Sequence, residues 1–369
     1  MAFRPLTRQT YKILDRYILG KYLKTFLLAM LLIIVIVITF DISEKLDDFL
    51  DSRAPISQII FNYYCNFIPG FVNLYSPLFI FISVLFFTSK MASNTEIIAI
   101  LGSGISYKRL LQPYLHGSVI VAFLILLLGN FVIPWSNQYL IAFEDKYIHT
   151  MHRNNYVDLH FQSAPGTLVY AQSYDVRSKT AFRYQQDSYN EEGLLVERLT
   201  ADNITYDSVE LRWLANRLVI RTVEGDKEHL EQVPRDMIDI NLTPNDFNLA
   251  STNITTLNTP QLIQYIHEQK LRGTGKVTTA KIELYQRFLT PLAVIVMTFI
   301  GVAISSRKTR GGIGVHLAIG ISIAFAFIVF MRISVVFATN GNLSPFLAVL
   351  LPQLLFALAA VYLIHTAPK

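Results

Sequence analysis

The sequence has few charged residues and a single cysteine. Of its 369 residues 16% are charged, whereas soluble domains average about 25%, so an ordinary soluble protein is excluded. Cys65 has no second cysteine, which excludes an internal disulfide and a cysteine-based metal site. The formal net charge is +5. The basic residues gather beside apolar runs, where a bilayer accounts for them, so no nucleic-acid partner is expected.

Long apolar runs predict six transmembrane helices in two groups of three. Each run approaches or exceeds the roughly 20 residues that a bilayer crossing needs. The first run follows a basic leader and is long enough to stay in the membrane, so no cleaved signal peptide is expected. The predicted spans are about 22–40, 59–89, 110–132, 288–305, 313–338 and 345–364.

Basic residues predict that both termini lie in the cytoplasm. Lys90, Lys108 and Arg109 flank the stretch between the second and third spans. The strongest basic cluster lies between the fourth and fifth spans. It consists of Arg307, Lys308 and Arg310. Counting crossings from a cytoplasmic N-terminus places both stretches inside, as the positive-inside rule requires.

The polar block between the two groups of spans predicts an antiparallel β domain. Runs at 167–171, 194–201 and 217–223 alternate apolar and polar residues and are separated by turn clusters. Such a block suits a small sandwich, jelly roll or open barrel. A closing helix is expected at 260–272, with Thr259 as N-cap and Gly273 as its stop. The predicted organisation is an N-terminal membrane half at 1–135, an extracytoplasmic β domain at 136–276 and a C-terminal membrane half at 277–369.

The stretch between the second and third spans predicts a short helix outside the bilayer, at 94–101. Ser93 and Glu96 have the spacing of a capping box, and Gly102 or Gly104 is expected to end the helix as a left-handed C-cap. The Glu96 carboxylate is either a cap and nothing more, or a group that also receives an arginine from a docking subunit.

No pattern in the sequence predicts catalysis or a cofactor. His149, His152 and His160 lie near one another, but no acid or thiol completes a metal site, and solvated histidines are the simpler interpretation. Two basic residues are candidates for lipid contact. Arg332 falls in the outer half of the fifth span, where a cation is costly, and Arg287 precedes the fourth span. Each is either a headgroup anchor or a ligand for an anionic lipid group.

Five stretches together resemble the LptF/LptG permeases, the membrane subunits of the lipopolysaccharide export ABC transporter. Their order and spacing follow the family pattern along the length of the chain, with three spans, a β domain and three more spans. The stretches are LDRYI (14–18), TEIIAILGSGIS (95–106), WLANRLVIR (213–221), LTPNDF (242–247) and YQRFLTPLAVIVM (285–297).

The resemblance implies a transport subunit of a Gram-negative inner membrane that hydrolyses no ATP itself. Its expected partners are an LptB-type ATPase dimer, a sister LptF/LptG-type permease, an LptC-like periplasmic jellyroll protein and lipopolysaccharide. The β domain is expected to be jellyroll-like, and the first and fifth spans to be lateral gates. The short helix takes the place of the coupling helix, so Glu96 is expected to pair with the ATPase. Ser93, Ile97, Leu101 and Gly104 complete the expected coupling residues.

One departure concerns the outer end of the first span. G-type members carry basic residues there, whereas this chain has DISEKLDD, in which Lys45 is the single cation. Lys45 and Arg287 remain candidates for lipid contact, and Arg332 is expected to compensate for the missing bases. The LDRYI start favours a G-like over an F-like chain. The alternative function is a membrane sensor or mechanotransmission protein whose β domain binds a periplasmic partner; an intramembrane enzyme is the weakest interpretation.

Overall fold

The computed structural model describes most of the chain. The described residues are 13–148, 155–175, 178–225, 227–238, 240, 242–244, 247, 253–271, 276–306, 312–341 and 343–366. Four features predicted above lie wholly or partly outside them: the basic leader as far as residue 12, His149 and His152, the stop at Gly273, and the basic cluster at 307–310. The chain forms two units, one of residues 1–46, 59–138 and 281–369, the other of residues 47–58 and 139–280.

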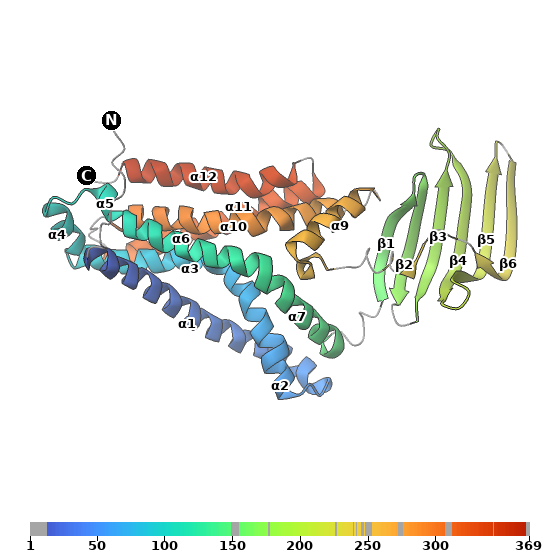
Figure 1. Ribbon diagram of the computed structural model, residues 1–369, viewed down its shortest axis with the longest axis horizontal. Helices are drawn as coiled ribbons and strands as arrows, with labels where there is room; N and C mark the ends of the chain where they lie inside the picture. The colour runs from blue at the N-terminus through green and yellow to red at the C-terminus, as the bar shows by residue number, and fades with distance from the viewer. Residues whose placement is uncertain are drawn as a thin grey trace. The chain divides into compact units, whose positions relative to one another are not determined.

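The first unit is a bundle built from six long apolar helices, as predicted (Figure 1). The spans run further than the apolar cores found in the sequence, because polar ends continue each helix beyond its hydrophobic part. The helices of this unit are α1 (Ile13–Asp51), α3 (Cys65–Ser93), α4 (Glu96–Gly102), α5 (Tyr107–Leu110), α6 (Gln112–Leu127), α7 (Ile133–Tyr147), α10 (Lys276–Ser305), α11 (Gly312–Asn340) and α12 (Pro345–His365). The short α2 (Ile56–Gln58) and the ends of α1, α7 and α10 fall in the second unit.

Glycines let the helices of the bundle approach closely. A Cβ added at Gly117 of α6 would lie 2.8 Å from the Tyr22 ring of α1, and one at Gly320 of α11 would meet Leu85 of α3. Small residues are common at helix contacts in membranes, where packing rather than the hydrophobic effect drives association. Tyr22 is fully buried, and its hydroxyl lies 2.9 Å from Thr298 Oγ1 of α10. This joins the N-terminal third of α1 to two neighbouring helices.

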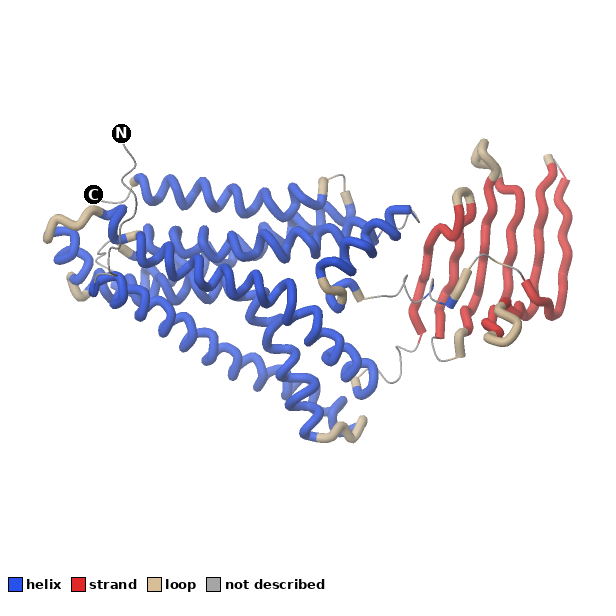
Figure 2. The backbone as a smooth tube through the Cα atoms, viewed as in Figure 1, coloured by secondary structure: helices blue, strands red, loops and turns tan. Residues whose placement is uncertain are grey.

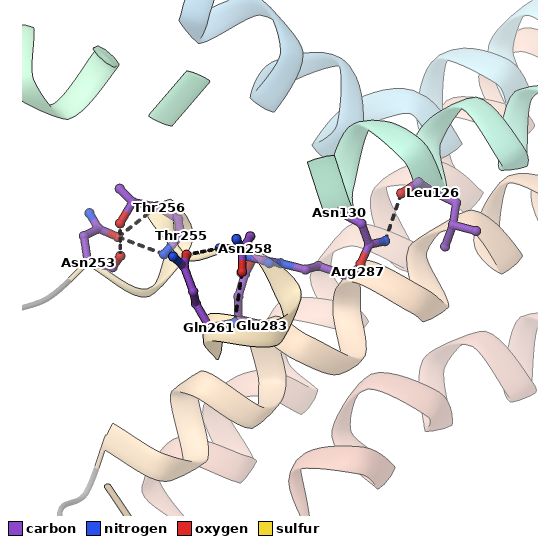
Figure 3. A network of polar contacts seen from close by, with 9 residues as sticks. All are labelled: Leu126, Asn130, Asn253, Thr255, Thr256, Asn258, Gln261, Glu283 and Arg287. Atoms are coloured by element: carbon purple, nitrogen blue, oxygen red, sulfur yellow. Dashed lines mark hydrogen bonds and ion pairs between the residues drawn. The ribbon is translucent and has the colours of Figure 1, made fainter. Parts of the chain in front are cut away.

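Two spans contain a π-helical segment with an asparagine at or just beyond it. The segments are η1 (Ile59–Tyr64), which leads into α3, and η2 (Leu128–Val132), which joins α6 to α7. Asn66 donates to the carbonyl oxygens of Phe61 and Asn62, and Asn130 donates to that of Leu126 at 2.9 Å (Figure 3). A π segment displaces carbonyls from α-helical bonding, so these amides satisfy backbone groups that lipid could not.

The second unit contains a six-stranded antiparallel sheet, as predicted (Figure 2). Consecutive strands pair, in the order β1-β2-β3-β4-β5-β6, which is a meander; a jelly roll would place strands distant in the sequence side by side. The strands are β1 (Asn155–Ala164), β2 (Thr167–Asp175), β3 (Thr180–Tyr189), β4 (Leu195–Asp207), β5 (Arg212–Glu224) and β6 (Lys227–Ile238). The three alternating runs of the sequence correspond to β2, β4 and β5.

The segment after β6 covers one face of the sheet. Trp213 of β5 is 1% exposed, and its indole N–H donates to the Leu242 carbonyl at 2.8 Å. Phe247 is fully buried and stacks on Tyr174 of β2 with the ring centroids 4.7 Å apart. The stretch LTPNDF therefore contributes Leu242 and Phe247 to the core of the sheet, which gives this stretch a structural role.

A short 3-10 turn, η3 (Ile254–Thr256), precedes α9 (Thr259–Leu271). The N-cap of α9 is Asn258, one residue before the predicted Thr259. The Gln261 amide N–H donates to Asn258 Oδ1 at 2.9 Å, and the Asn258 N–H donates to Gln261 Oε1 at 3.0 Å (Figure 3). This reciprocal pair is a capping box. Asparagine and threonine are both suitable N-cap residues. Asn258 takes the position because Gln261 lies three residues after it and completes the capping box.

Candidate functional site

The helix α4 lies between two spans, as predicted, but its N-terminus is built differently. The capping box of Ser93 and Glu96 is wrong, because Ser93 is still the last residue of α3. The chain reverses at Thr95, which has a left-handed φ of 62° and makes no side-chain cap. A serine inside one helix cannot have the extended backbone that an N-cap of the next helix requires. Glu96 therefore has no capping role.

The other end of α4 follows the prediction. Gly104 has a left-handed φ of +86°, and its N–H donates to the Leu101 carbonyl at 3.1 Å. One face of the helix is anchored, because Ile97 is 2% exposed and Leu101 packs against the same apolar cluster. The next residue, Ile98, points away from this anchored face and is 55% exposed. The helix is thus fixed on the bundle and presents an apolar side chain outward.

The Glu96 carboxylate contacts the N-terminal end of α1. It accepts a hydrogen bond from the Tyr17 hydroxyl at 2.8 Å and lies 3.2 Å from Lys21 Nζ. Burial raises the pKa of Glu96, but the hydrogen bonds from Tyr17 and Lys21 outweigh it, so the pKa falls below its ordinary value. The sequence reasoning missed both partners. Their four-residue spacing on one helix face was the available signal.

A second charged contact joins the same two regions. Arg109 of α5 binds Asp15 of α1 through two hydrogen bonds, of which the Nη1–Oδ1 bond is 2.7 Å. Asp15 is 7% exposed, so the pair is partly desolvated. Paired, planar contacts of this kind are the stronger arginine–carboxylate bonds. The sequence reasoning used Arg109 only as a topology marker and missed Asp15, because 94 residues separate the two.

Lys45, a candidate for lipid contact, lies in a polar cluster at the far end of α1. Its ammonium group is 3.3 Å from Asp41 and also contacts the Tyr63 hydroxyl. Tyr64 donates to the other Asp41 oxygen at 3.1 Å. In this cluster a carboxylate of the same helix neutralises the lysine, and the two tyrosines join α1 to η1.

The two other candidate cations have opposite environments. Arg287 is 4% exposed and forms an ion pair with Glu283, one turn earlier on α10, at 3.0 Å (Figure 3). Arg332 is exposed on α11, and no hydrogen-bond or ion-pair partner is found for it among the described residues. Eight residues separate it from the end of α11 at Asn340, about 12 Å along the helix axis. The structure does not bring the three candidate cations into one cluster.

Six apolar helices of spanning length, an inserted antiparallel sheet and a short helix presented between two spans define a multi-pass membrane subunit. A family model described as "Lipopolysaccharide export system permease LptF/LptG" matches residues 16–366, so the chain belongs to this family. Comparison with curated protein sequences gave no match. The chain is therefore a permease of the lipopolysaccharide export system. It is a transmembrane subunit without catalytic activity, and the ATPase of the system is LptB.

Proposed function

We propose that α4 is the coupling helix on which an LptB-type ATPase dimer docks. The supporting observation is that α4 buries Ile97 and exposes Ile98. On a helix between two spans, an exposed isoleucine and an acid offer a protein partner both an apolar and a charged contact. In this arrangement Glu96 and Ile98 contact the ATPase, while Ile97 and Leu101 fix the helix to the bundle.

The proposed orientation places α4, α5 and both termini in the cytoplasm and the β domain in the periplasm of a Gram-negative cell. Lys90, Lys108 and Arg109 beside α4 and the basic stretch 307–310 support it. The sheet ends in the strands β1 and β6, whose outer edges offer backbone groups for strand addition. An LptC-like jellyroll protein is the proposed periplasmic partner at one of these edges.

The proposed sister permease and lipid cavity adjoin α1 and α11. Their apolar windows are 11% and 22% buried, the lowest shares among the six described spans, so both helices offer long apolar faces. Arg332 on α11 is the proposed ligand for an anionic group of lipopolysaccharide, because it is exposed at membrane depth. Lys45 and Arg287 already pair with carboxylates of their own helices, so they are weaker candidates for lipid contact.

The test of the coupling helix is affinity purification of the chain from native membranes, followed by mass spectrometry of bound protein and lipid. Wild type is expected to bring down an ATPase and lipopolysaccharide, and Glu96→Arg to lose the ATPase. The matched control is the double variant Tyr17→Phe with Lys21→Met, which removes the internal partners of Glu96 but keeps its carboxylate. This control is expected to retain the ATPase.

Two outcomes would contradict the proposal. If Glu96→Arg keeps the ATPase, the carboxylate serves contacts within the chain and does not hold the partner. If the wild type brings down no ATPase and no lipid from native membranes, the sensor or mechanotransmission alternative is favoured. For Arg332, loss of lipid crosslinking and export in Arg332→Gln is expected, and unchanged crosslinking would reject it as a ligand.

A further inference from the structure

We propose that the inner end of α1 is clamped to the α4–α5 segment by two charged contacts, and that this clamp makes α1 follow the movement of α4. The two contacts are Glu96 with Tyr17 and Lys21, and Arg109 with Asp15. We refer to these five residues as the α1 clamp. The inference rests on the proposed docking of an ATPase at α4 and adds a group of positioning residues to it.

The first contact holds α4 directly. Tyr17 and Lys21 lie one turn apart on α1, and both reach the Glu96 carboxylate, at 2.8 Å and 3.2 Å. Lys21 Nζ also lies 4.2 Å from the centroid of the Tyr17 ring. This cation–π contact restricts the conformations of both side chains that donate to Glu96. Because Glu96 is the first residue of α4, a displacement of the N-terminal turn of α4 acts on α1 without an intermediate side chain.

The second contact holds α5 at the other end of the same segment. Arg109 lies in the last turn of α5, and its N–H donates to Ser106 Oγ, the N-cap of this one-turn helix. Its guanidinium binds both carboxylate oxygens of Asp15. The Arg109 side chain is 26% exposed and that of Asp15 is 10% exposed. Each charge has therefore lost part of its contact with water, and the attraction to the other charge compensates for this loss. Asp15 precedes Tyr17 by two residues, so both contacts act on the first turns of α1.

The remainder of α1 is held much less firmly. Ile18, Tyr22, Phe26 and Met30 are buried on one face, but along α1, every residue of which is described, none between Met30 and Phe49 is buried. Beyond Met30 the polar contacts of α1 to the bundle are those of Asp41 and Lys45. A helix held near its two ends, with an apolar middle facing outward, turns about one end when the other is moved.

The test uses the complex purified with its partners in proteoliposomes, and it measures ATP hydrolysis and lipopolysaccharide extracted per ATP. Arg109→Glu is expected to lower the extraction per ATP roughly tenfold, within the usual range of coupling free energies, while the ATPase remains bound and active. Asp15→Asn is a milder variant with the same expected direction. The exchange of charges, Asp15→Arg with Arg109→Asp, is expected to restore most of the coupling.

The matched control is Lys108→Glu, which makes the same charge change on the neighbouring, exposed residue of α5. It is expected to leave extraction per ATP unchanged. The clamp is rejected if Arg109→Glu and Asp15→Asn keep the wild-type ratio, if the charge exchange fails to restore it, or if Lys108→Glu lowers it equally. Loss of the ATPase from Arg109→Glu would also reject it, by making Arg109 a docking residue. Failure of ATPase docking in the wild type would instead reject the proposed function.

Discussion

Replacing Gly117 by alanine tests how closely α1 is packed against the bundle. The added Cβ would lie 2.8 Å from Cδ1 and 3.0 Å from Cε1 of Tyr22, whereas carbon atoms in contact are about 3.5–4.0 Å apart. Tyr22 is fully buried, with the rings of Phe87 and Tyr114 packed edge-on against it. Because the ring is fully enclosed, either it or the helix α1 must move by roughly 0.7 Å.

The expected cost follows from two contributions. Overpacking of a buried site costs about 1–3 kcal/mol. A shift of the ring also lengthens the bond between the Tyr22 hydroxyl and Thr298 Oγ1, now 2.9 Å, whose loss adds about 1 kcal/mol. Tyr22→Phe removes only this second contribution, because Thr298 keeps its bond to the Val294 carbonyl at 2.8 Å. Gly117→Ala should therefore destabilise the N-terminal part of α1 more than Tyr22→Phe does.

The measurement is amide hydrogen exchange along α1 in nanodiscs, supported by thermal unfolding. Gly20→Ala is the matched control, since Gly20 lies on α1 itself and its added Cβ would meet nothing within 4 Å. That control should slow exchange slightly, because alanine favours helix by about 1 kcal/mol over glycine. Equal exchange in Gly117→Ala and Gly20→Ala would refute the close contact between α1 and α6.

Three further predictions concern the β domain and α4. Burial raises the pKa of Tyr174 to about 12, and its hydroxyl has no hydrogen-bond partner among the described residues; Tyr174→Phe should therefore leave thermal stability unchanged or raise it by about 1 kcal/mol, and a clear loss would reveal a partner. Trp213→Ala should cost about 3–5 kcal/mol and make β5 cleavable by protease, whereas resistance equal to wild type would contradict the packing described for the sheet. Because the pKa of Glu96 is lowered, its contribution to stability is complete above the unfolded value of about 4.3 and is lost as the pH falls through the folded value. Exchange in α4, corrected for intrinsic rates, should then be constant between about pH 6 and 8, and a transition in that range would contradict the pairing with Lys21.

The order of the elements could be predicted from the sequence because it depends on local composition. A run of about 20 apolar residues forms a transmembrane helix in a bilayer. Alternation of apolar and polar residues with a period of two identifies strands such as β4 and β5. A left-handed glycine at the end of α4 was also predictable, at Gly102 or Gly104, since glycine adopts this conformation without steric cost; the structure selects Gly104. These signals need no knowledge of distant residues.

The parts that were missed depend on residues far apart in the sequence or on competing local signals. The bond between Asp15 and Arg109 spans 94 residues, and no local pattern marks it. Serine is a preferred N-cap residue, but α3 continues through Ser93. An arginine just before an apolar span is typical of a headgroup anchor, but Arg287 pairs with Glu283, one turn away on α10. A tertiary contact decided the role of Arg109, whereas continuation of the same helix decided that of Ser93 and a partner one turn away on the same helix decided that of Arg287.

The π-helical segments η1 and η2 affect how these spans tolerate a change of length. Each segment holds one residue more than an α-helix would need for the same bonds, and Asn66 and Asn130 satisfy displaced carbonyls. Deleting one residue within Leu128–Val132 would return the chain to α-helical bonding, and the residues on either side would keep their faces toward the bundle. The same deletion in a regular turn would rotate everything beyond it by about 100°. The two segments are thus the points at which these spans can lose a residue without losing their packing.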